Sequence, residues 1–213
     1  MVIFDFDGTL VDTAYDVAQS LNEALERKGF SKNEVKDIMP LLGGKLEDII
    51  KGLIPEENKT VENIKDIAGE YKRVYRESKK EHSVPFKGVL GLLDKLKENN
   101  IKMAINSNKP QEFLEEMVDD FFFKDTFDYV IWYKEWLPPK PSPVGTQSII
   151  ECCGVLPNET IYIGDGEIDH TTAGTAGVEF MYIRPLQTEF SHWKDSIVVK
   201  CQYQISIWKE WLW

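Results

Sequence analysis

The chain has 213 residues, and the 42% of them that are apolar are enough to bury a sizeable core, which argues against a disordered chain. A formal net charge of -11 and a pI near 4.8 argue against nucleic acid and anionic lipid as partners, because both require a basic face. The expected partner is therefore a small ligand, with no nucleic acid and no membrane.

The first predicted element is a strand at "VIFDF", which runs into the stretch "FDFDGTLVD". Residues two apart in a strand point to the same side, so Asp5 and Asp7 should project together from its carboxyl end. Gly8 and Thr9 then turn the chain, and backbone amides exposed at such a turn can cradle an anion. Paired carboxylates beside an anion cradle indicate a bridging divalent cation such as Mg²⁺. The alternative is a solvated acidic turn.

The segment from about Ala14 to Ser83 contains no convincing strand but several helical patterns. Apolar residues three and four positions apart recur along it, as in Val17, Leu21, Ala24 and Leu25 and again in Leu46, Ile49, Ile50 and Leu53. We therefore expect a small helical cap domain at 14–83. It would be inserted into a core domain formed by 1–13 and 84–213.

Beyond this insertion, short apolar strands alternate with helical segments. The strand candidates are "KMAIN" from Lys102, "YVIW" from Tyr129, "TIYIG" from Thr160 and "VEFMYI" from Val178. Helical spacing occurs at 92–96 and 113–118. The alternation and the near-continuous hydrophobicity predict parallel strands covered on both faces. The expected fold class is α/β, with a Rossmann-like parallel sheet and a small α-helical cap.

Three of these later strands end in polar groups. After the second strand, "NSNKP" offers the hydroxyl of Ser107 before a helix with Pro110 in its first turn. After the third, "PPKPSP" holds Lys140, and after the fourth, "GDGEID" supplies Asp165 and Asp169. Taken singly, each has an ordinary structural alternative: a helix cap for Ser107, a solvated loop lysine for Lys140 and an Asx turn for Asp165. Because ligands bind at the carboxyl ends of such sheets, the residues together indicate a site for a metal-bound phosphate.

The final residues, "SIWKEWLW", contain three of the six tryptophans. Ser206 is a candidate N-cap for a terminal helix on which Trp208 and Trp211 would share a face. This face would pack against the chain's own body or, alternatively, against a second subunit. The expected state is a monomer or homodimer.

Cysteine usage and the amino terminus bear on the compartment. The three cysteines are odd in number and form no C-x-x-C pair, so buried, reduced thiols are expected at Cys152, Cys153 and Cys201. No apolar run approaches about 18 residues, and Met1 leads directly into "VIFDFD" without a basic segment or cleavage signal. The expected location is the cytoplasm.

Together the motifs resemble those of the haloacid dehalogenase superfamily and, within it, of the phosphoglycolate phosphatase-like branch. "DFDGTLVD" is similar to the first motif, D-x-D-G-T-L-x-D, and "NSNKP" to the second, whose key residue is Ser or Thr. "KPSP" resembles the lysine motif, and "GDGEID" followed by "TTAGTAG" resembles the fourth. The resemblance covers nearly the whole chain, including a helical cap directly after the first motif. It implies a Mg²⁺-dependent phosphatase for small phosphorylated metabolites such as phosphoglycolate.

The resemblance also implies a role for each motif residue. Asp5 would be the nucleophile that forms a phosphoaspartate, and Asp7 would be the general acid and then the general base. Ser107 and Lys140 would hold the phosphate oxygens while charge spreads over them. The phosphate contacts implied are Gly8, Thr9, Ser107, Asn108, Lys140 and Lys45. The Mg²⁺ contacts implied are Asp5, Asp7 through its carbonyl, Asp165 and Asp169, the last of which would support the ion through water or orient Lys140.

Several alternatives remain open. The cap reads "PLLGGKLEDI", where Lys45 replaces the proline of many relatives and would either enter the site or be a solvated cap lysine. A Schiff base on Lys45 would indicate phosphonoacetaldehyde hydrolysis. A sugar phosphomutase would need a cap histidine, for which His82 is the candidate, and dehalogenation is disfavoured by Asp7. The alternative from another class is a non-catalytic binding module, although every motif residue is present.

Overall fold

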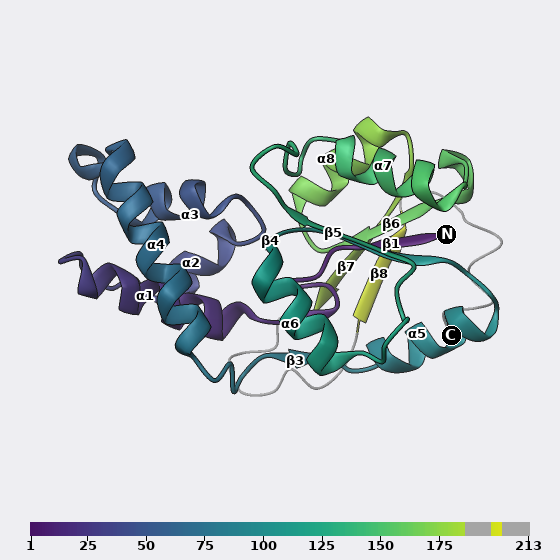
Figure 1. Ribbon diagram of the computed structural model, residues 1–213, viewed down its shortest axis with the longest axis horizontal. Coiled ribbons are helices and arrows are strands. Elements are labelled where there is room, and N and C mark those ends of the chain that lie inside the picture. Colours follow the sequence, from purple (N-terminus) through teal and green to yellow (C-terminus); the bar gives the residue numbers. More distant parts are fainter. Residues whose placement is uncertain (186–196, 202–213) are drawn as a thin grey trace. The chain divides into compact units, whose positions relative to one another are not determined.

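The computed structural model describes residues 1–185 and 197–201, which form two compact units (Figure 1). The core unit comprises Met1–Val11 together with the described residues from Pro85 on. The helical unit comprises Asp12–Val84. It contains the whole segment that the sequence indicates as a helical insertion.

A six-stranded sheet forms the middle of the core unit, in the order β5-β4-β1-β6-β7-β8. Its strands are β1 Val2–Phe4, β4 Met103–Pro110, β5 Tyr129–Tyr133, β6 Ile161–Gly164, β7 Glu179–Pro185 and β8 Ile197–Cys201. β5, β4, β1, β6 and β7 run parallel, as predicted. β8, a strand that the sequence pattern did not indicate, pairs antiparallel with β7 at the edge of the sheet. An antiparallel neighbour needs no crossover helix, so the alternating pattern does not indicate it.

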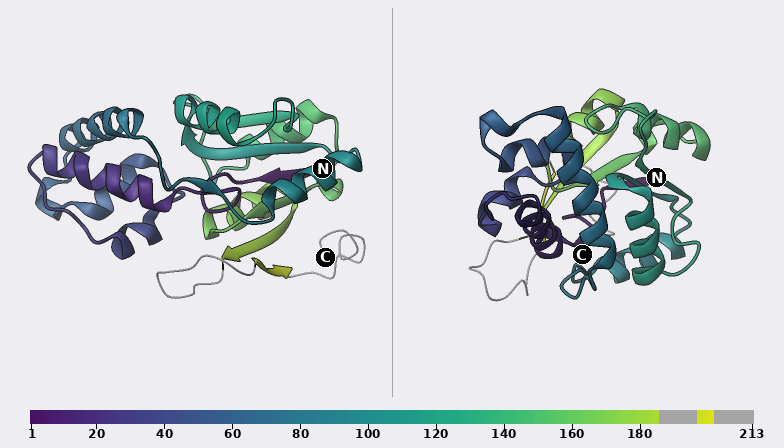
Figure 2. Two further views of the ribbon diagram at one scale, coloured as in Figure 1. Left: turned by 90° about the horizontal axis from the view of Figure 1, so that it is seen from below. Right: turned by 60° about the vertical axis from the view of Figure 1, so that its left-hand side comes forward.

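Helices cover both faces of the sheet, as the sequence predicts (Figure 1 and Figure 2). They are α5 Val89–Glu98 and α6 Gln111–Phe121 on one face and α7 Val144–Cys153 and α8 Glu167–Ala176 on the other, with a 3₁₀ turn at Pro157–Glu159. Val2 and Phe4 of β1 belong to the apolar cluster of α5 and α6, whereas Ile3 belongs to that of α7 and α8. This burial on both sides explains the continuous hydrophobicity of the strand and fixes it inside the sheet.

Four helices make up most of the helical unit. They are α1 Ala14–Arg27, α2 Val35–Ile38, α3 Leu46–Leu53 and α4 Val61–Glu77, with 3₁₀ turns at Met39–Leu41 and Glu56–Asn58. α1 and α4 pack against each other, and the apolar spacing along them buries residues such as Leu25 and Ile64. α4 begins where the Thr60 hydroxyl accepts a hydrogen bond from the Asn63 backbone N–H at 3.1 Å.

The chain enters and leaves the helical unit through two short strands that pair with each other, β2 Val11–Asp12 and β3 Val84–Pro85. Just inside them, Oδ2 of the buried Asp16 accepts hydrogen bonds from the Ser83 hydroxyl at 2.7 Å and from the His82 backbone N–H at 3.1 Å. The ring of His82 packs edge-on against a tyrosine of α1. These contacts join the first and last residues of the helical unit.

The described cysteine side chains are not buried. Cys152 is exposed and Cys153 is half-buried, and both thiols are free. Both lie in the last turn of α7, whose buried positions are Ile149 and Ile150 one turn earlier. The expectation of buried thiols is therefore wrong for these two residues, because the end of the helix leaves Cys152 exposed and packs Cys153 only partly against the core.

Two expectations concern the chain's surroundings. The predicted terminal helix with Ser206, Trp208 and Trp211 lies outside the described residues. In the part of the chain that the structure describes, no helix is both long enough and apolar enough to cross a membrane.

Candidate active site

The carboxyl ends of the central strands bring the predicted residues of the core unit together. Asp5 directly follows β1, Ser107 lies in the last part of β4, and Asp165 directly follows β6. Since β4, β1 and β6 are neighbours in the sheet, these ends lie side by side at one edge. Lys140 comes from the loop between β5 and α7, and Asp169 comes from the first turn of α8.

Three carboxylates form a cluster at this edge. One oxygen each of Asp5, Asp165 and Asp169 lies within 4.8 Å of the others. Burial, together with the nearby Asp169 carboxylate, raises the pKa of Asp5 well above its ordinary value of 3.8. The same two causes raise the pKa of Asp165 from 3.8 to about 6. Buried negative charges therefore repel one another here, and a bound cation would relieve that repulsion.

The ammonium group of Lys140 partly neutralises the cluster. Its Nζ donates hydrogen bonds at 2.6 Å to Oδ1 of Asp5 and at 2.6 Å to Oδ1 of Asp169. Burial alone would lower the pKa of Lys140, but the Asp169 and Asp5 carboxylates raise it well above 10.5, so the side chain is charged. Three carboxylates against one ammonium leave this cluster with a net negative charge.

Asn108 holds the loop that carries Lys140. Its Oδ1 accepts a hydrogen bond from the Lys140 backbone N–H at 2.9 Å, and its Nδ2 donates one to the Lys140 carbonyl at 3.1 Å. The resemblance implies that Asn108 is a phosphate contact, and in the structure both the oxygen and the nitrogen of its amide bind the backbone of Lys140. Asn108 therefore acts on the site through the placement of that lysine.

Tyr162 is a buried contributor that sequence reasoning missed. Its hydroxyl lies 3.0 Å from the Asn106 carbonyl and 3.3 Å from Oδ1 of Asp169, and it can donate its proton to one of them at a time. Burial raises the pKa of Tyr162 well above 10, so the hydroxyl stays neutral. Its position within the predicted strand "TIYIG" marked it only as a core residue.

Asp7 lies apart from the carboxylate cluster. β1 ends at Phe4, so the alternation that was expected to align Asp7 with Asp5 does not extend to it. The Asp7 carboxylate instead pairs with Lys109, whose Nζ lies 2.8 Å from Oδ1. Sequence reasoning did not select Lys109. The one available signal was its place two residues after Ser107 in "NSNKP".

The turn after Asp7 uses its own amides. The Gly8 N–H donates to the Val11 carbonyl at 2.9 Å, and the Thr9 N–H donates to the Phe6 carbonyl at 3.4 Å. The structure therefore does not leave these two amides open as the expected anion cradle. The Thr9 hydroxyl donates to Oδ1 of Asp165 at 3.3 Å, so the turn supports the carboxylate cluster.

Gly8 is required at this turn for two reasons. Its φ is +82°, and a Cβ built on it would lie 2.4 Å from Oδ2 of Asp165. We expect Gly8→Ala to destabilise the fold by roughly 1–3 kcal/mol and to lower activity, because Asp165 must move. Gly29→Ala is the matched control, since φ is +81° there and no atom lies within 4 Å of the added Cβ. Urea denaturation compares the two, and equal losses of stability would contradict an effect of crowding at Asp165.

The remaining predicted residues are Ser107 and Pro110 in the core unit and Lys45 in the helical unit. Ser107 is buried in the core unit, where its Oγ accepts a hydrogen bond from the Lys109 backbone N–H at 3.1 Å. Pro110 ends β4 and directly precedes α6, so the expectation that it lies in the first turn of the helix is wrong. Lys45 is exposed in the helical unit, directly before α3.

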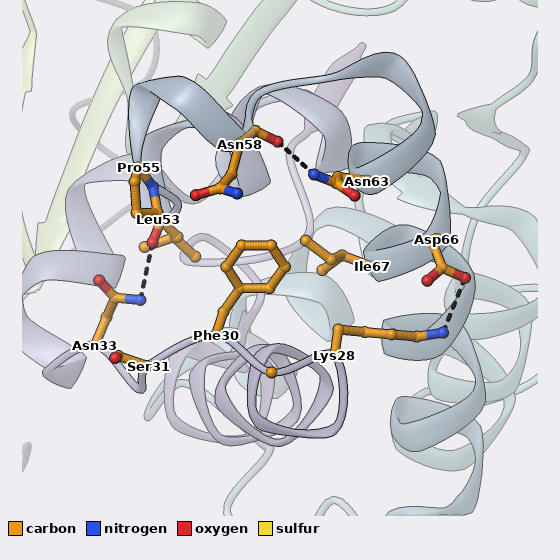
Figure 3. A pocket seen from close by; sticks show the side chains of 11 residues that line it. Lys28, Phe30, Ser31, Asn33, Leu53, Pro55, Asn58, Asn63, Asp66 and Ile67 are labelled. Atoms are coloured by element: carbon orange, nitrogen blue, oxygen red, sulfur yellow. Dashed lines mark hydrogen bonds and ion pairs between the residues drawn. The ribbon is translucent and has the colours of Figure 1, made fainter.

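The helical unit contains a pocket of about 680 Å³ that holds none of the predicted residues (Figure 3). The ring of Phe30 projects into it between Leu53 and Ile67, and Asn58 and Asn63 lie beyond the ring (Figure 3). Its polar groups pair with one another: Asn33 donates to the Leu53 carbonyl at 3.3 Å, and Lys28 binds Asp66 at 2.8 Å. This pocket gathers no set of reactive groups comparable to the carboxylate cluster.

The carboxylate cluster suits a hard divalent cation. Carboxylate oxygens are the ligands that Mg²⁺ prefers, and here they converge from two strand ends and a helix start. The net negative charge of the cluster and the raised pKa values of Asp5 and Asp165 favour the same ion. The side chain of Asp7 is not part of this carboxylate cluster. The metal contact that the resemblance implies for Asp7 would be made by its backbone carbonyl.

A doubly wound α/β core that gathers buried acids and an ammonium at its strand ends is the architecture of an enzyme acting on a small anion. Residues 2–183 match the family described as haloacid dehalogenase-like hydrolase. The chain belongs to this family.

Individual relatives agree with this assignment. The phosphoglycolate phosphatase of Aquifex aeolicus is 26% identical over 183 residues, which are 84% of this chain and 82% of that protein. Phosphoglycolate phosphatase 1 of Pseudomonas aeruginosa is 25% identical over 182 residues, which are 84% of this chain but 66% of that protein. A solved structure from Bacteroides fragilis, described as that of a haloacid dehalogenase-like hydrolase, is 28% identical with a TM-score of 0.77 and covers 84% of each chain.

Proposed function

We propose that this chain is a Mg²⁺-dependent phosphatase that hydrolyses small phosphate monoesters, phosphoglycolate being the nearest candidate, through a phosphoaspartate on Asp5. The observation that carries the proposal is the convergence of Asp5, Asp165, Asp169 and Lys140 at the carboxyl ends of parallel strands. Relatives named phosphoglycolate phosphatase support the substrate class. A cytoplasmic location and a monomeric or homodimeric state stay predictions.

In the first step, a carboxylate oxygen of Asp5 attacks the phosphorus, and the bond from phosphorus to the leaving oxygen breaks. Lys140 holds Oδ1 of Asp5 at 2.6 Å, which leaves Oδ2 for the attack. Asp7 gives a proton to the leaving oxygen, so that the product departs as an alcohol. A Mg²⁺ ion held by Asp5, Asp165, Asp169 and the Asp7 carbonyl would offset the repulsion between Asp5 and the anionic ester.

In the second step, water opens the phosphoaspartate. Asp7 takes a proton from the water as its oxygen attacks phosphorus, and the bond from phosphorus to Asp5 breaks. Inorganic phosphate leaves and the Asp5 carboxylate is restored. The Ser107 hydroxyl and the Lys140 ammonium hold the phosphoryl oxygens over which charge spreads in both steps.

No observation on the described residues favours the alternative enzyme activities. A Schiff base would need Lys45, which is exposed directly before α3. A phosphomutase would need a proton-shuttling histidine, and the ring of His82 packs against a tyrosine of its own unit. A non-catalytic module could use the carboxylate cluster to bind a cation, and it is distinguished from an enzyme by turnover of a phosphate ester.

The proposal is tested with a panel of phosphorylated small molecules that includes phosphoglycolate, sugar phosphates, alkyl phosphates and an aryl phosphate. Released inorganic phosphate is measured with Mg²⁺, with a chelator, and after Mg²⁺ is restored. We expect hydrolysis of monoesters that stops with chelator and returns with the metal, and no hydrolysis of a diester control. Absence of turnover on every monoester in the presence of Mg²⁺ would refute the proposed function.

A further inference from the structure

Lys109 is a buried cation that has no role in the two steps of the proposed phosphatase mechanism. Its side chain is only 4% exposed, and a lysine is rarely buried unless a partner offsets the loss of hydration. The Nζ donates a hydrogen bond at 2.8 Å to Oδ1 of Asp7. This ion pair joins the end of β4 to the turn that follows β1.

Of three consecutive residues at the end of β4, the last two reach other parts of the site, whereas the contact of Ser107 lies within the strand. The Ser107 hydroxyl accepts a hydrogen bond from the Lys109 backbone N–H at 3.1 Å. Asn108 binds the backbone of Lys140 at 2.9 and 3.1 Å. Lys109 then reaches Asp7, and its Nζ lies 6.0 Å from the centre of the buried Phe6 ring, an arrangement that favours a cation.

Asp7 itself lacks the support of a regular strand. β1 ends at Phe4, and the Asp7 side chain is 23% exposed, whereas that of Lys109 is enclosed. The enclosed ammonium is therefore the better fixed member of the pair. A partly exposed carboxylate that must meet a leaving oxygen gains from such an anchor, because proton transfer depends on placement within hydrogen-bond reach.

We propose that Lys109 is a positioning residue that holds the Asp7 carboxylate where it meets the leaving oxygen of the ester. The inference rests on the proposed function, in which Asp7 passes the proton. Lys109 touches neither the phosphorus nor the attacking oxygen in this scheme. Its effect must therefore depend on how much the leaving group needs a proton.

The experiment compares an alkyl phosphate, whose alkoxide leaves poorly without a proton, with a nitrophenyl phosphate, whose phenolate leaves readily. Lys109→Met keeps an unbranched apolar stem and removes the charged ammonium group. We expect kcat/KM for the alkyl ester to fall by about 10- to 100-fold and that for the aryl ester by less than about threefold. Lys109→Arg, which keeps the ion pair, should recover part of the loss on the alkyl ester.

Controls separate this role from a purely structural one. Lys97→Met removes an exposed lysine of α5 and should leave both esters unaffected. Equal losses on the two esters in folded Lys109→Met would overturn the positioning role, and Lys109→Gln provides the same comparison should the Met variant not fold. If the wild-type protein hydrolyses neither ester, the proposed function fails. If the wild-type protein hydrolyses both esters but Lys109→Met slows them equally, only the positioning role of Lys109 is refuted and the proposed function stands.

Discussion

Asp5→Asn should lower phosphate-ester turnover by more than about 10⁴-fold, which is the largest effect on activity that we expect from a single substitution. The amide has nearly the shape of the carboxylate, but it is a poor nucleophile and cannot form the mixed anhydride with phosphate. The measurement is the release of inorganic phosphate at saturating ester and Mg²⁺. Acid quenching during turnover should trap labelled phosphoprotein in the wild type and not in the variant.

The loss should come from chemistry and not from unfolding. Asp5 belongs to a cluster in which three carboxylates face one ammonium, and burial with Asp169 raises its pKa. Removing one of the negative charges should leave the thermal midpoint of the metal-free protein unchanged or higher at neutral pH. Asp94→Asn, at an exposed aspartate of α5, is the matched control for activity. An Asp5→Asn protein that keeps more than about one hundredth of wild-type turnover would exclude Asp5 as the nucleophile.

Most of the fold could be predicted because its signals are local. Each parallel strand is a short apolar run, and the helical segments at 92–96 and 113–118 carry their own spacing. β8 was not predicted because an edge strand with an antiparallel neighbour lacks the alternation of strand and helix that indicates parallel strands. The exposed Cys152 was misjudged because residue type alone does not say which way the last turn of a helix faces.

The candidate site was predictable only in part, because the missing features are contacts between distant segments. Asp5 and Asp165 directly follow β1 and β6, so the pairing of these two strands is enough to bring them together. The ion pair of Asp7 with Lys109 spans 102 positions and depends on where β1 stops. The use of Asn108 on the backbone of Lys140 depends likewise on the path of a loop. The spacing of residues within a motif cannot predict either contact.

Lys140→Met should have the largest effect on stability, with a substantial loss of activity as well. The Lys140 ammonium is buried and lies 2.6 Å from each of Asp5 and Asp169, which are both 3% exposed. Removing one partner of a buried ion pair leaves charge uncompensated and costs about 3–5 kcal/mol. A chain of this size should lose roughly 6–20 °C in thermal midpoint. The lost phosphate contact should lower kcat by about 10²- to 10³-fold in the folded variant.

The pH dependence of this loss identifies its cause. The pKa values of Asp5 and Asp165 are raised, so these acids destabilise the fold increasingly as pH rises through their folded pKa, which is about 6 for Asp165. Removal of the Lys140 cation should raise the pKa values of Asp5 and Asp165 further. The thermal midpoint of the variant should therefore differ least from that of the wild type at pH 5 and most at pH 8. Lys95→Met, at an exposed lysine of α5, should show no such divergence. A difference in thermal midpoint between Lys140→Met and wild type that stays constant from pH 5 to pH 8 would indicate lost packing of the lysine stem. Lys140 would then not be the counter-charge of the cluster.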